Sequence, residues 1–205
     1  MGVEMRRPLM LVSPGLGNSG PTHWQSLWEA DPAVQPAARV ARRDWDRPDR
    51  DEWRCELDAA VRGAAAASSA IVLVGHSLAC LNFADWAGRA AAESPELLRV
   101  VRGALLVAPP NPDRPDAPER RSLIGSFAPV PSARLPTPTV VVASRTDPYA
   151  DFAFAERLAR SWGSRLVDAG DAGHVNAASG LGAWEAGRRL LLELMRDAVE
   201  ARPSL

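Results

Sequence analysis

The chain has 205 residues and 46% of them are hydrophobic, which is typical of one globular domain with a sizeable core. We therefore predict a single domain over residues 1–205. The 24 basic and 25 acidic side chains nearly cancel, so no net field favours nucleic acid or a membrane surface as a partner. Two cysteines and three histidines, in no zinc-like spacing, predict neither a disulfide framework nor a zinc site. No metal or organic cofactor is expected.

The N-terminal segment predicts no export signal. Its apolar stretch, Leu9-Met10-Leu11-Val12, is too short for a signal-peptide core and ends at Pro14-Gly15. No run in the sequence approaches the roughly 20 apolar residues of a membrane span. We therefore expect a cytoplasmic protein.

Short apolar runs alternate with helical patterns along the chain. Strands are predicted over residues 9–12, 38–41, 70–74, 100–107, 139–143 and 164–167. Helices are predicted after a Thr22 cap and over residues 50–67, 77–92, 119–124, 151–162 and 181–201. This alternation predicts an α/β fold, a three-layer α/β/α sandwich with a mostly parallel sheet of about six strands.

The segment Gly75-His76-Ser77-Leu78-Ala79 follows the most apolar predicted strand and precedes a helix. A sharp strand-to-helix turn lifts a serine hydroxyl out of the sheet edge as a nucleophile, and the residues two before and two after it must be small. Gly75 and Ala79 meet that need, although the strict pattern has glycine in the place of Ala79. In the competing interpretation, Ser77 only caps the helix.

A general base for Ser77 is sought among the three histidines. His76 adjoins Ser77 and cannot fold back onto it, and His23 lies in the first loop. His174 follows the last predicted strand, where the order serine, acid, histidine of this fold places the base.

The acid is expected at the end of a strand between Ser77 and His174. Asp147 follows the strand over residues 139–143 and would orient the His174 imidazole. Asp168 and Asp171 are rivals, and an Asp-Pro turn or a helix cap is the structural alternative for Asp147.

Two backbone amides are expected to hold an oxyanion. One is the Leu78 N–H, directly after the nucleophile, and the other is the Leu16 N–H in the glycine-rich loop over residues 14–21. As a phosphate loop the segment lacks the Gly-Lys-Ser/Thr of a P-loop. As a dinucleotide loop it is interrupted by Pro21, a weaker exclusion because proline is tolerated in a first helical turn.

The sequence resembles the small serine hydrolases of the retinoblastoma-binding-protein-9 and YdeN type, a branch of the α/β hydrolases. The matching runs are Pro14-Gly15, Asn18-Ser19-Gly20, His23-Trp24-Gln25 with Trp28, Asp44-Trp45 with Pro48 and Trp53, Gly75 to Cys80, Asp147-Pro148-Tyr149, and Gly173 to Gly182. The resemblance implies a fold without a large cap domain, and Ser77, Asp147 and His174 as the catalytic residues.

The predicted function is hydrolysis of a small carboxylic ester through an acyl-enzyme. Gly15, His23, Trp24 and His76 are candidates for substrate contact, with core packing as the alternative for the tryptophan. A thioesterase, amidase or acyltransferase with the same three residues stays open. So does a protein-binding module on a hydrolase scaffold, because some members of the family are discussed as binding factors.

Overall fold

The computed structural model describes residues 7–114 and 118–200. Its centre is a six-stranded sheet in the order β2-β1-β3-β4-β5-β6, in which every neighbouring pair is parallel. The strands are β1 (Leu9–Ser13), β2 (Ala37–Arg39), β3 (Ile71–His76), β4 (Val101–Val107), β5 (Thr139–Ala143) and β6 (Arg165–Asp168). This sheet with helices on both faces is an α/β-hydrolase fold, as the sequence predicts.

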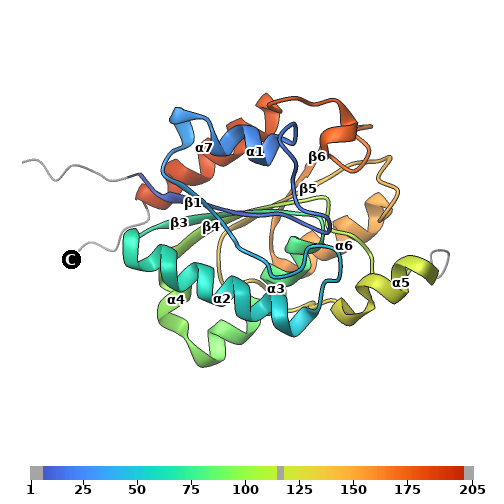
Figure 1. Cartoon of the computed structure of the whole chain (residues 1–205), viewed down its shortest axis with the longest axis horizontal. Coiled ribbons are helices and arrows are strands. Elements are labelled where there is room, and N and C mark those ends of the chain that lie inside the picture. Colours follow the sequence, from blue (N-terminus) through green and yellow to red (C-terminus); the bar gives the residue numbers. More distant parts are fainter. Residues whose placement is uncertain (1–6, 115–117, 201–205) are drawn as a thin grey trace, which may run out of the picture.

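Helices cover both faces of the sheet (Figure 1). On one face lie α1 (Trp24–Glu29) and α7 (Glu185–Glu200). The other face is covered by α2 (Arg50–Ala67), α3 (Leu78–Glu93), α4 (Pro95–Val100) and α6 (Phe152–Trp162). A further helix, α5 (Pro118–Ile124), and three short 3₁₀ turns, η1 (Pro32–Val34), η2 (Gly125–Phe127) and η3 (Ala177–Ser179), lie in the connections.

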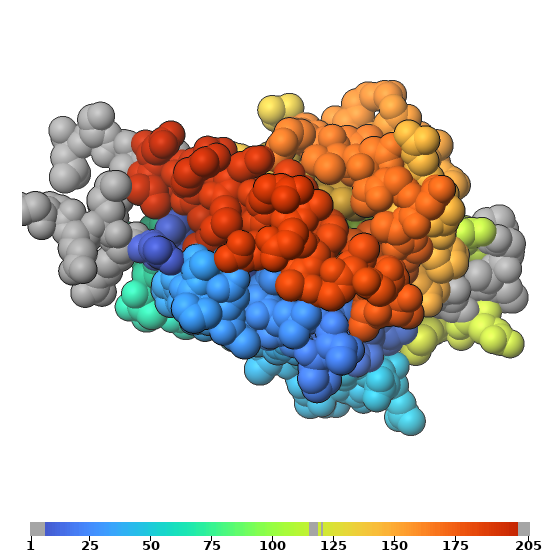
Figure 2. Space-filling view, turned by 90° about the horizontal axis from the view of Figure 1, so that it is seen from above, coloured from blue at the N-terminus to red at the C-terminus, as the bar shows by residue number. Residues whose placement is uncertain are grey.

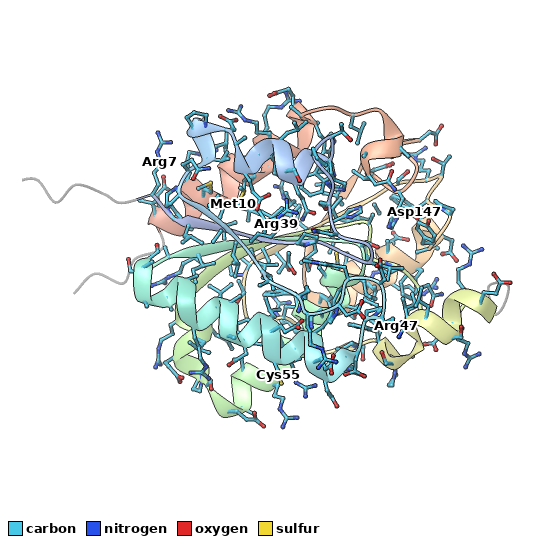
Figure 3. All side chains as sticks on the ribbon, viewed as in Figure 1. Arg7, Met10, Arg39, Arg47, Cys55 and Asp147 are labelled. Carbon is cyan, nitrogen blue, oxygen red and sulfur yellow. The ribbon has the colours of Figure 1, made fainter. Side chains whose placement is uncertain are left out.

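Strand alternation divides the core into two clusters. In β1, Leu9 and Leu11 pack with the α2–α3 layer, whereas Met10 and Val12 pack with α1 and α7, as the two-residue period of a strand requires. Figure 3 shows Met10 on the α1 side of the sheet and Cys55 on the outer side of α2. Buried on both faces, the strands are apolar almost throughout, as in other parallel sheets.

The two ends of the described chain meet over one face. In Figure 2 the blue segment that carries α1 lies against the red segment that carries α7. Trp24, Trp28 and Trp184 form the contact, with ring centroids 4.5 to 5.8 Å apart, and the Trp28 indole donates to the Ala183 carbonyl (2.6 Å). This aromatic cluster fixes the loop over residues 173–184 against the start of the chain.

Most predicted elements agree with the structure to within a few residues, but three details differ. His23, not Thr22, caps α1, because its Nδ1 accepts a hydrogen bond from the Gln25 amide. The sequence analysis missed α4, which occupies the residues directly before β4. The terminal helix begins at Glu185 rather than at residue 181, because residues 181–184 form a turn; its last predicted residue, Ala201, lies outside the described residues.

Candidate active site

Ser77 lies on the sharp turn between β3 and α3. Its φ is 56° and its ψ −124°, a sparsely populated conformation with positive φ that costs an L-residue on the order of 1–3 kcal/mol. The turn is held by the Ser77 amide, which donates to the Val107 carbonyl (2.8 Å). Ala79, where the strict pattern has glycine, is fully buried at the start of α3, so the turn accommodates its methyl group.

The Ser77 hydroxyl does not cap α3. It makes no capping hydrogen bond to the described residues of the helix, and instead Oγ lies 2.8 Å from His174 Nε2. The helix-cap interpretation of Ser77 is therefore wrong.

His174 lies between Ser77 and Asp147. Its other ring nitrogen, Nδ1, is 2.9 Å from Asp147 Oδ2 and 3.0 Å from Oδ1. Both side chains are nearly buried, at 7% and 4% exposure. The carboxylate also accepts a hydrogen bond from the Tyr149 amide (2.8 Å), and the Tyr149 ring packs edge-on against the imidazole. The geometry therefore aligns hydroxyl, imidazole and carboxylate in one chain of hydrogen bonds.

Two hydroxyls join the loop after β5 to the loop that carries His174. Ser144 Oγ accepts from the Ala172 amide (3.0 Å) and donates to the Gly170 carbonyl (3.1 Å). Thr146 Oγ1 accepts from the Gly173 amide (3.1 Å). These bonds keep the two loops in register over the sheet edge.

Neither rival acid hydrogen-bonds His174. Asp168, at the end of β6, pairs with Arg145 and accepts from the Gly170 amide. Asp171 is exposed. Of the three aspartates considered in the sequence, the structure brings Asp147 alone to the imidazole.

The first loop passes directly beside Ser77. A Cβ on Gly15 would lie 2.8 Å from Ser77 Cβ, 2.9 Å from the His76 carbonyl and 3.3 Å from the Leu78 nitrogen. Only glycine allows this approach. The next amide, that of Leu16, forms no hydrogen bond to a described residue, and Leu78 is the first residue of α3, where helical amides lack an intrahelical acceptor. Both are thus free to bind an anionic oxygen.

Replacing Gly15 with alanine is expected to displace the Leu16 amide from the nucleophile. Loss of this predicted oxyanion donor is expected to lower kcat on the order of 100- to 1,000-fold, with the fold retained. Steady-state kinetics of ester hydrolysis would measure it. Gly88→Ala is the control, because this exposed glycine of α3 has open space around its Cβ position; equal kcat in the two variants would contradict the assignment.

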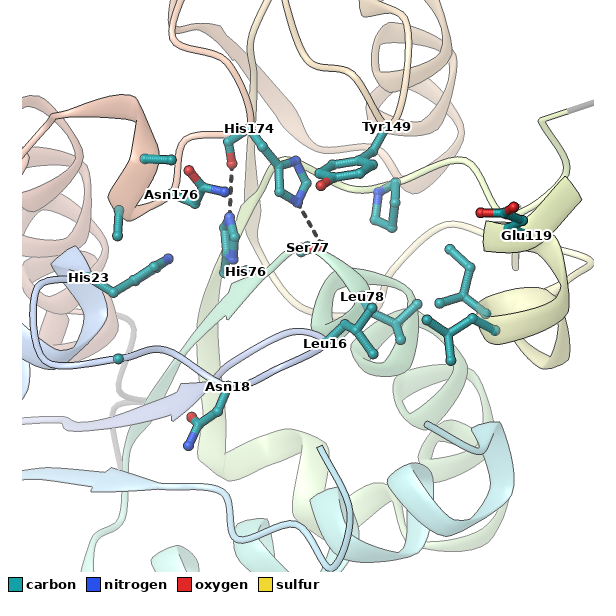
Figure 4. A pocket seen from close by; sticks show the side chains of 16 residues that line it. Leu16, Asn18, His23, His76, Ser77, Leu78, Glu119, Tyr149, His174 and Asn176 are labelled. Carbon is teal, nitrogen blue, oxygen red and sulfur yellow. Dashed lines mark hydrogen bonds between the residues drawn. The ribbon is translucent and has the colours of Figure 1, made fainter. Parts of the chain in front are cut away.

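A cavity of about 890 Å³ opens at Ser77 (Figure 4). Its lining comes from the first loop, the turn that carries Ser77, α5 and the loops after β4, β5 and β6. The lining residues are Leu16, Asn18, Gly20, His23, His76, Ser77, Leu78, Pro110, Glu119, Leu123, Ile124, Tyr149, His174, Asn176, Ala177 and Ala178. The connection between β4 and β5, which carries Pro110 and α5, therefore borders the site.

Two of the four candidates for substrate contact are not among the lining residues. Gly15 instead allows the backbone of the first loop to lie close to Ser77, as described above. Trp24 is 1% exposed and its indole donates to the Val175 carbonyl (2.7 Å), so it supports the loop that follows His174. His23 and His76 do line the cavity. The lining residues of α5, Glu119, Leu123 and Ile124, carry no motif in the sequence and were missed.

Burial keeps two histidines of the site uncharged. For His23, burial lowers the pKa from 6.5 to about 4, aided by the Arg39 and His174 charges. For His76, burial lowers the pKa well below 6.5, with His174 and His23 adding to the effect. At neutral pH both rings are neutral hydrogen-bonding groups.

These shifts predict a loss of stability in mild acid. Below pH 6.5 His23 is protonated in the unfolded chain, whereas in the folded chain it stays neutral down to about pH 4. The free energy of unfolding therefore falls as the pH falls. For His23 alone, with its shift from 6.5 to about 4, the loss between pH 7 and pH 5 is about 2 kcal/mol. Urea denaturation at both pH values would measure it. His23→Asn, which preserves a capping side chain, should lose about 2 kcal/mol less, and an unchanged loss would contradict the prediction.

Residues 7–114 and 118–200 have neither a cluster of metal ligands nor a membrane-spanning helix. This part of the chain contains no group of three or more His, Cys, Asp or Glu side chains able to hold a metal ion. It also contains no helix with the length and apolar character needed to cross a membrane.

A parallel sheet between two helical layers, with a serine on the turn after its third strand, defines the class of α/β hydrolases. The model of the family described as "Serine hydrolase" matches residues 10–193. The chain therefore belongs to the serine hydrolase family, and it is a hydrolase of YdeN type.

Solved structures agree with this assignment. The chain is 31% identical to a YdeN-like hydrolase from Pectobacterium atrosepticum, with a TM-score of 0.73 over 92% of this chain and 91% of that one. The ydeN gene product of B. subtilis shares 14% identity, with a TM-score of 0.69 over 92% and 99% of the two chains. Esterase 2 of Thermogutta terrifontis shares 17% identity, with a TM-score of 0.66 over 97% and 86%. A search of curated protein sequences gives no significant match.

Proposed function

We propose that the protein is a serine esterase that cleaves small carboxylic esters through an acyl-enzyme, with Ser77 as nucleophile, His174 as base and Asp147 as the acid that orients it. The observation that carries the proposal is the pair of short contacts at His174, 2.8 Å to Ser77 Oγ and 2.9 Å to Asp147 Oδ2, at the wall of a cavity. A ring held from both sides in this way can take the serine proton and return it.

The first half of the reaction forms the acyl-enzyme. His174 Nε2 removes the proton from Ser77 as Oγ forms a bond to the ester carbonyl carbon. The negative charge that develops on the carbonyl oxygen is held by the amides of Leu16 and Leu78. The bond to the alcohol oxygen then breaks, and the imidazolium gives its proton to the leaving alkoxide.

The second half releases the acid. A water molecule gives a proton to His174 Nε2 and attacks the acyl carbon, and the bond to Ser77 Oγ breaks as the oxygen regains its proton. The Asp147 carboxylate stays ionised throughout and stabilises the imidazolium of each half.

The size of the cavity supports a small substrate. Its volume of about 890 Å³ lies within the ~300–1,000 Å³ of sites for small organic ligands. Among the described lining residues, Glu119 is the one with a permanent charge. The cavity therefore favours an uncharged ester over a charged substrate. The Thermogutta terrifontis esterase that shares the fold has been solved with butyrate bound.

A panel of butanoyl compounds tests the proposal. The same acyl group is offered to the wild-type protein as an oxyester, a thioester and an amide, and kcat/KM is measured for each. We expect the oxyester to be cleaved fastest. Cleavage of the thioester or the amide alone would replace the esterase by the corresponding alternative, and a folded protein inert to all three would favour a binding module.

A further inference from the structure

The cavity has two unlike sides, with Ser77 between them. Figure 4 shows His23, His76 and Asn176 on one side of the serine, and we call these three the polar wall. Leu16, Leu78 and the helix α5 with Glu119 lie on the other side (Figure 4). We call the apolar lining residues Leu16, Leu78, Pro110, Leu123 and Ile124 the apolar wall. Leu16 and Leu123 are both 38% exposed, and they are two of the three large apolar side chains that the described surface exposes.

The polar wall contains a hydrogen-bond donor without a partner. His23 Nδ1 accepts the Gln25 amide hydrogen (3.2 Å), so in the neutral ring the proton lies on Nε2. The His23 side chain is almost fully buried, at 4% exposure, and its Nε2 has no hydrogen-bond partner among the described residues. Buried polar groups are nearly always paired. The missing acceptor for this N–H therefore indicates that a bound ligand supplies one.

A hydrogen-bond acceptor lies next to that donor. His76 Nε2 donates to the His174 carbonyl (3.0 Å), which leaves the lone pair of the neutral ring on Nδ1. The rings of His23 and His76 are 4.8 Å apart between centroids, and in Figure 4 His23 points toward His76. One N–H and one lone pair therefore belong to two adjacent rings, and burial keeps both rings neutral by lowering each pKa.

We infer that the substrate is an uncharged ester with two arms: an apolar arm that lies against the apolar wall, and an arm with a hydroxyl that binds the polar wall. The hydroxyl oxygen accepts the His23 Nε2–H, and the hydroxyl hydrogen is donated to His76 Nδ1. The inference rests on the proposed esterase function, because it places the scissile carbonyl at Ser77 between the two walls.

Matched esters that differ by one group test the inference. On the alcohol side, 2-hydroxyethyl butanoate is compared with propyl butanoate, and on the acyl side propyl 3-hydroxybutanoate with propyl 3-methylbutanoate. Each pair replaces a methyl by a hydroxyl of similar size. In one of the two pairs we expect kcat/KM of the wild type to be about tenfold or more higher for the hydroxylated ester, since two hydrogen bonds are made and no buried group is left unpaired.

The variant His23→Ser removes the donor and retains a capping hydroxyl for α1. We expect the hydroxyl preference, which is the ratio of the two kcat/KM values within a pair, to fall to about one through a higher KM for the hydroxylated ester. The matched control is Leu123→Ser on the apolar wall. This variant should lower kcat/KM for both esters of each pair alike and leave the ratio of the two values unchanged.

Nitrogen-15 NMR of the wild type provides a readout that needs no variant to fold. The chain has only three histidines, and at pH 7 His23 should show a protonated Nε2 and an unprotonated Nδ1. The opposite tautomer, absence of a hydroxyl preference in both pairs, or a preference that survives in His23→Ser would each overturn the inference. If ester hydrolysis depends on Ser77 but shows no preference for the hydroxylated esters, the two-arm inference is wrong and the esterase proposal stands. If hydrolysis survives in Ser77→Ala, the esterase proposal itself is wrong.

Discussion

The variant Ser77→Ala is expected to lose ester hydrolysis almost completely, with kcat lowered on the order of 10⁶-fold, as for other nucleophile deletions in serine hydrolases. The reason is chemical: without Oγ no acyl-enzyme forms, and only the amide donors and the shape of the cavity remain. Steady-state kinetics with an activated ester would measure the loss.

The fold of Ser77→Ala should survive. The Ser77 side chain caps nothing in α3, and the turn depends on its amide, which donates to Val107, so thermal unfolding should match the wild type to within a few degrees. Activity within tenfold of the wild type in a folded Ser77→Ala protein would contradict the role assigned to the serine.

The variant Asp147→Asn is expected to lower kcat on the order of 10⁴-fold. An amide in place of the carboxylate cannot stabilise the imidazolium, and its NH₂ group can donate to His174 Nδ1 and so favour the wrong tautomer. Because both side chains are nearly buried, water cannot replace the carboxylate. The loss should lie in kcat and leave KM nearly unchanged, since the acid lies behind His174 and is not among the residues that line the cavity.

The other two aspartates considered in the sequence supply controls for Asp147→Asn. Asp171 is exposed and Asp168 pairs with Arg145, so Asp171→Asn and Asp168→Asn should each keep kcat within a few-fold of the wild type. If either variant cost more than Asp147→Asn, the assignment of the acid would be wrong.

The three proposed catalytic residues could be predicted from the order in which strands and loops follow each other along the chain. Each buried parallel strand is apolar on both faces and reads clearly in the sequence, and the loops that follow β3, β5 and β6 all meet at one edge of the sheet. For that reason Ser77, Asp147 and His174 could be proposed together although each lies in an ordinary local motif. Asp168 and Asp171 stayed open as rivals in the sequence, and the hydrogen bonds of His174 single out Asp147.

The walls of the cavity could not be predicted in this way. Leu123 and Ile124 reach the site from α5, whose position depends on the irregular chain after β4 and not on a local pattern. Trp24 and His23 are neighbours in sequence, yet one is buried behind the cavity and the other lines it. The tautomers of His23 and His76 follow from hydrogen bonds to the Gln25 amide and the His174 carbonyl, which no sequence pattern encodes.

Covalent labelling by a fluorophosphonate, followed by mass spectrometry of the peptides, tests the central claim most directly. The probe reacts with a serine only when a base and an oxyanion site activate it. The account predicts one adduct per chain, on Ser77, formed far more slowly in Asp147→Asn and absent in Ser77→Ala. An adduct on another residue, or undiminished labelling of Ser77→Ala, would contradict it.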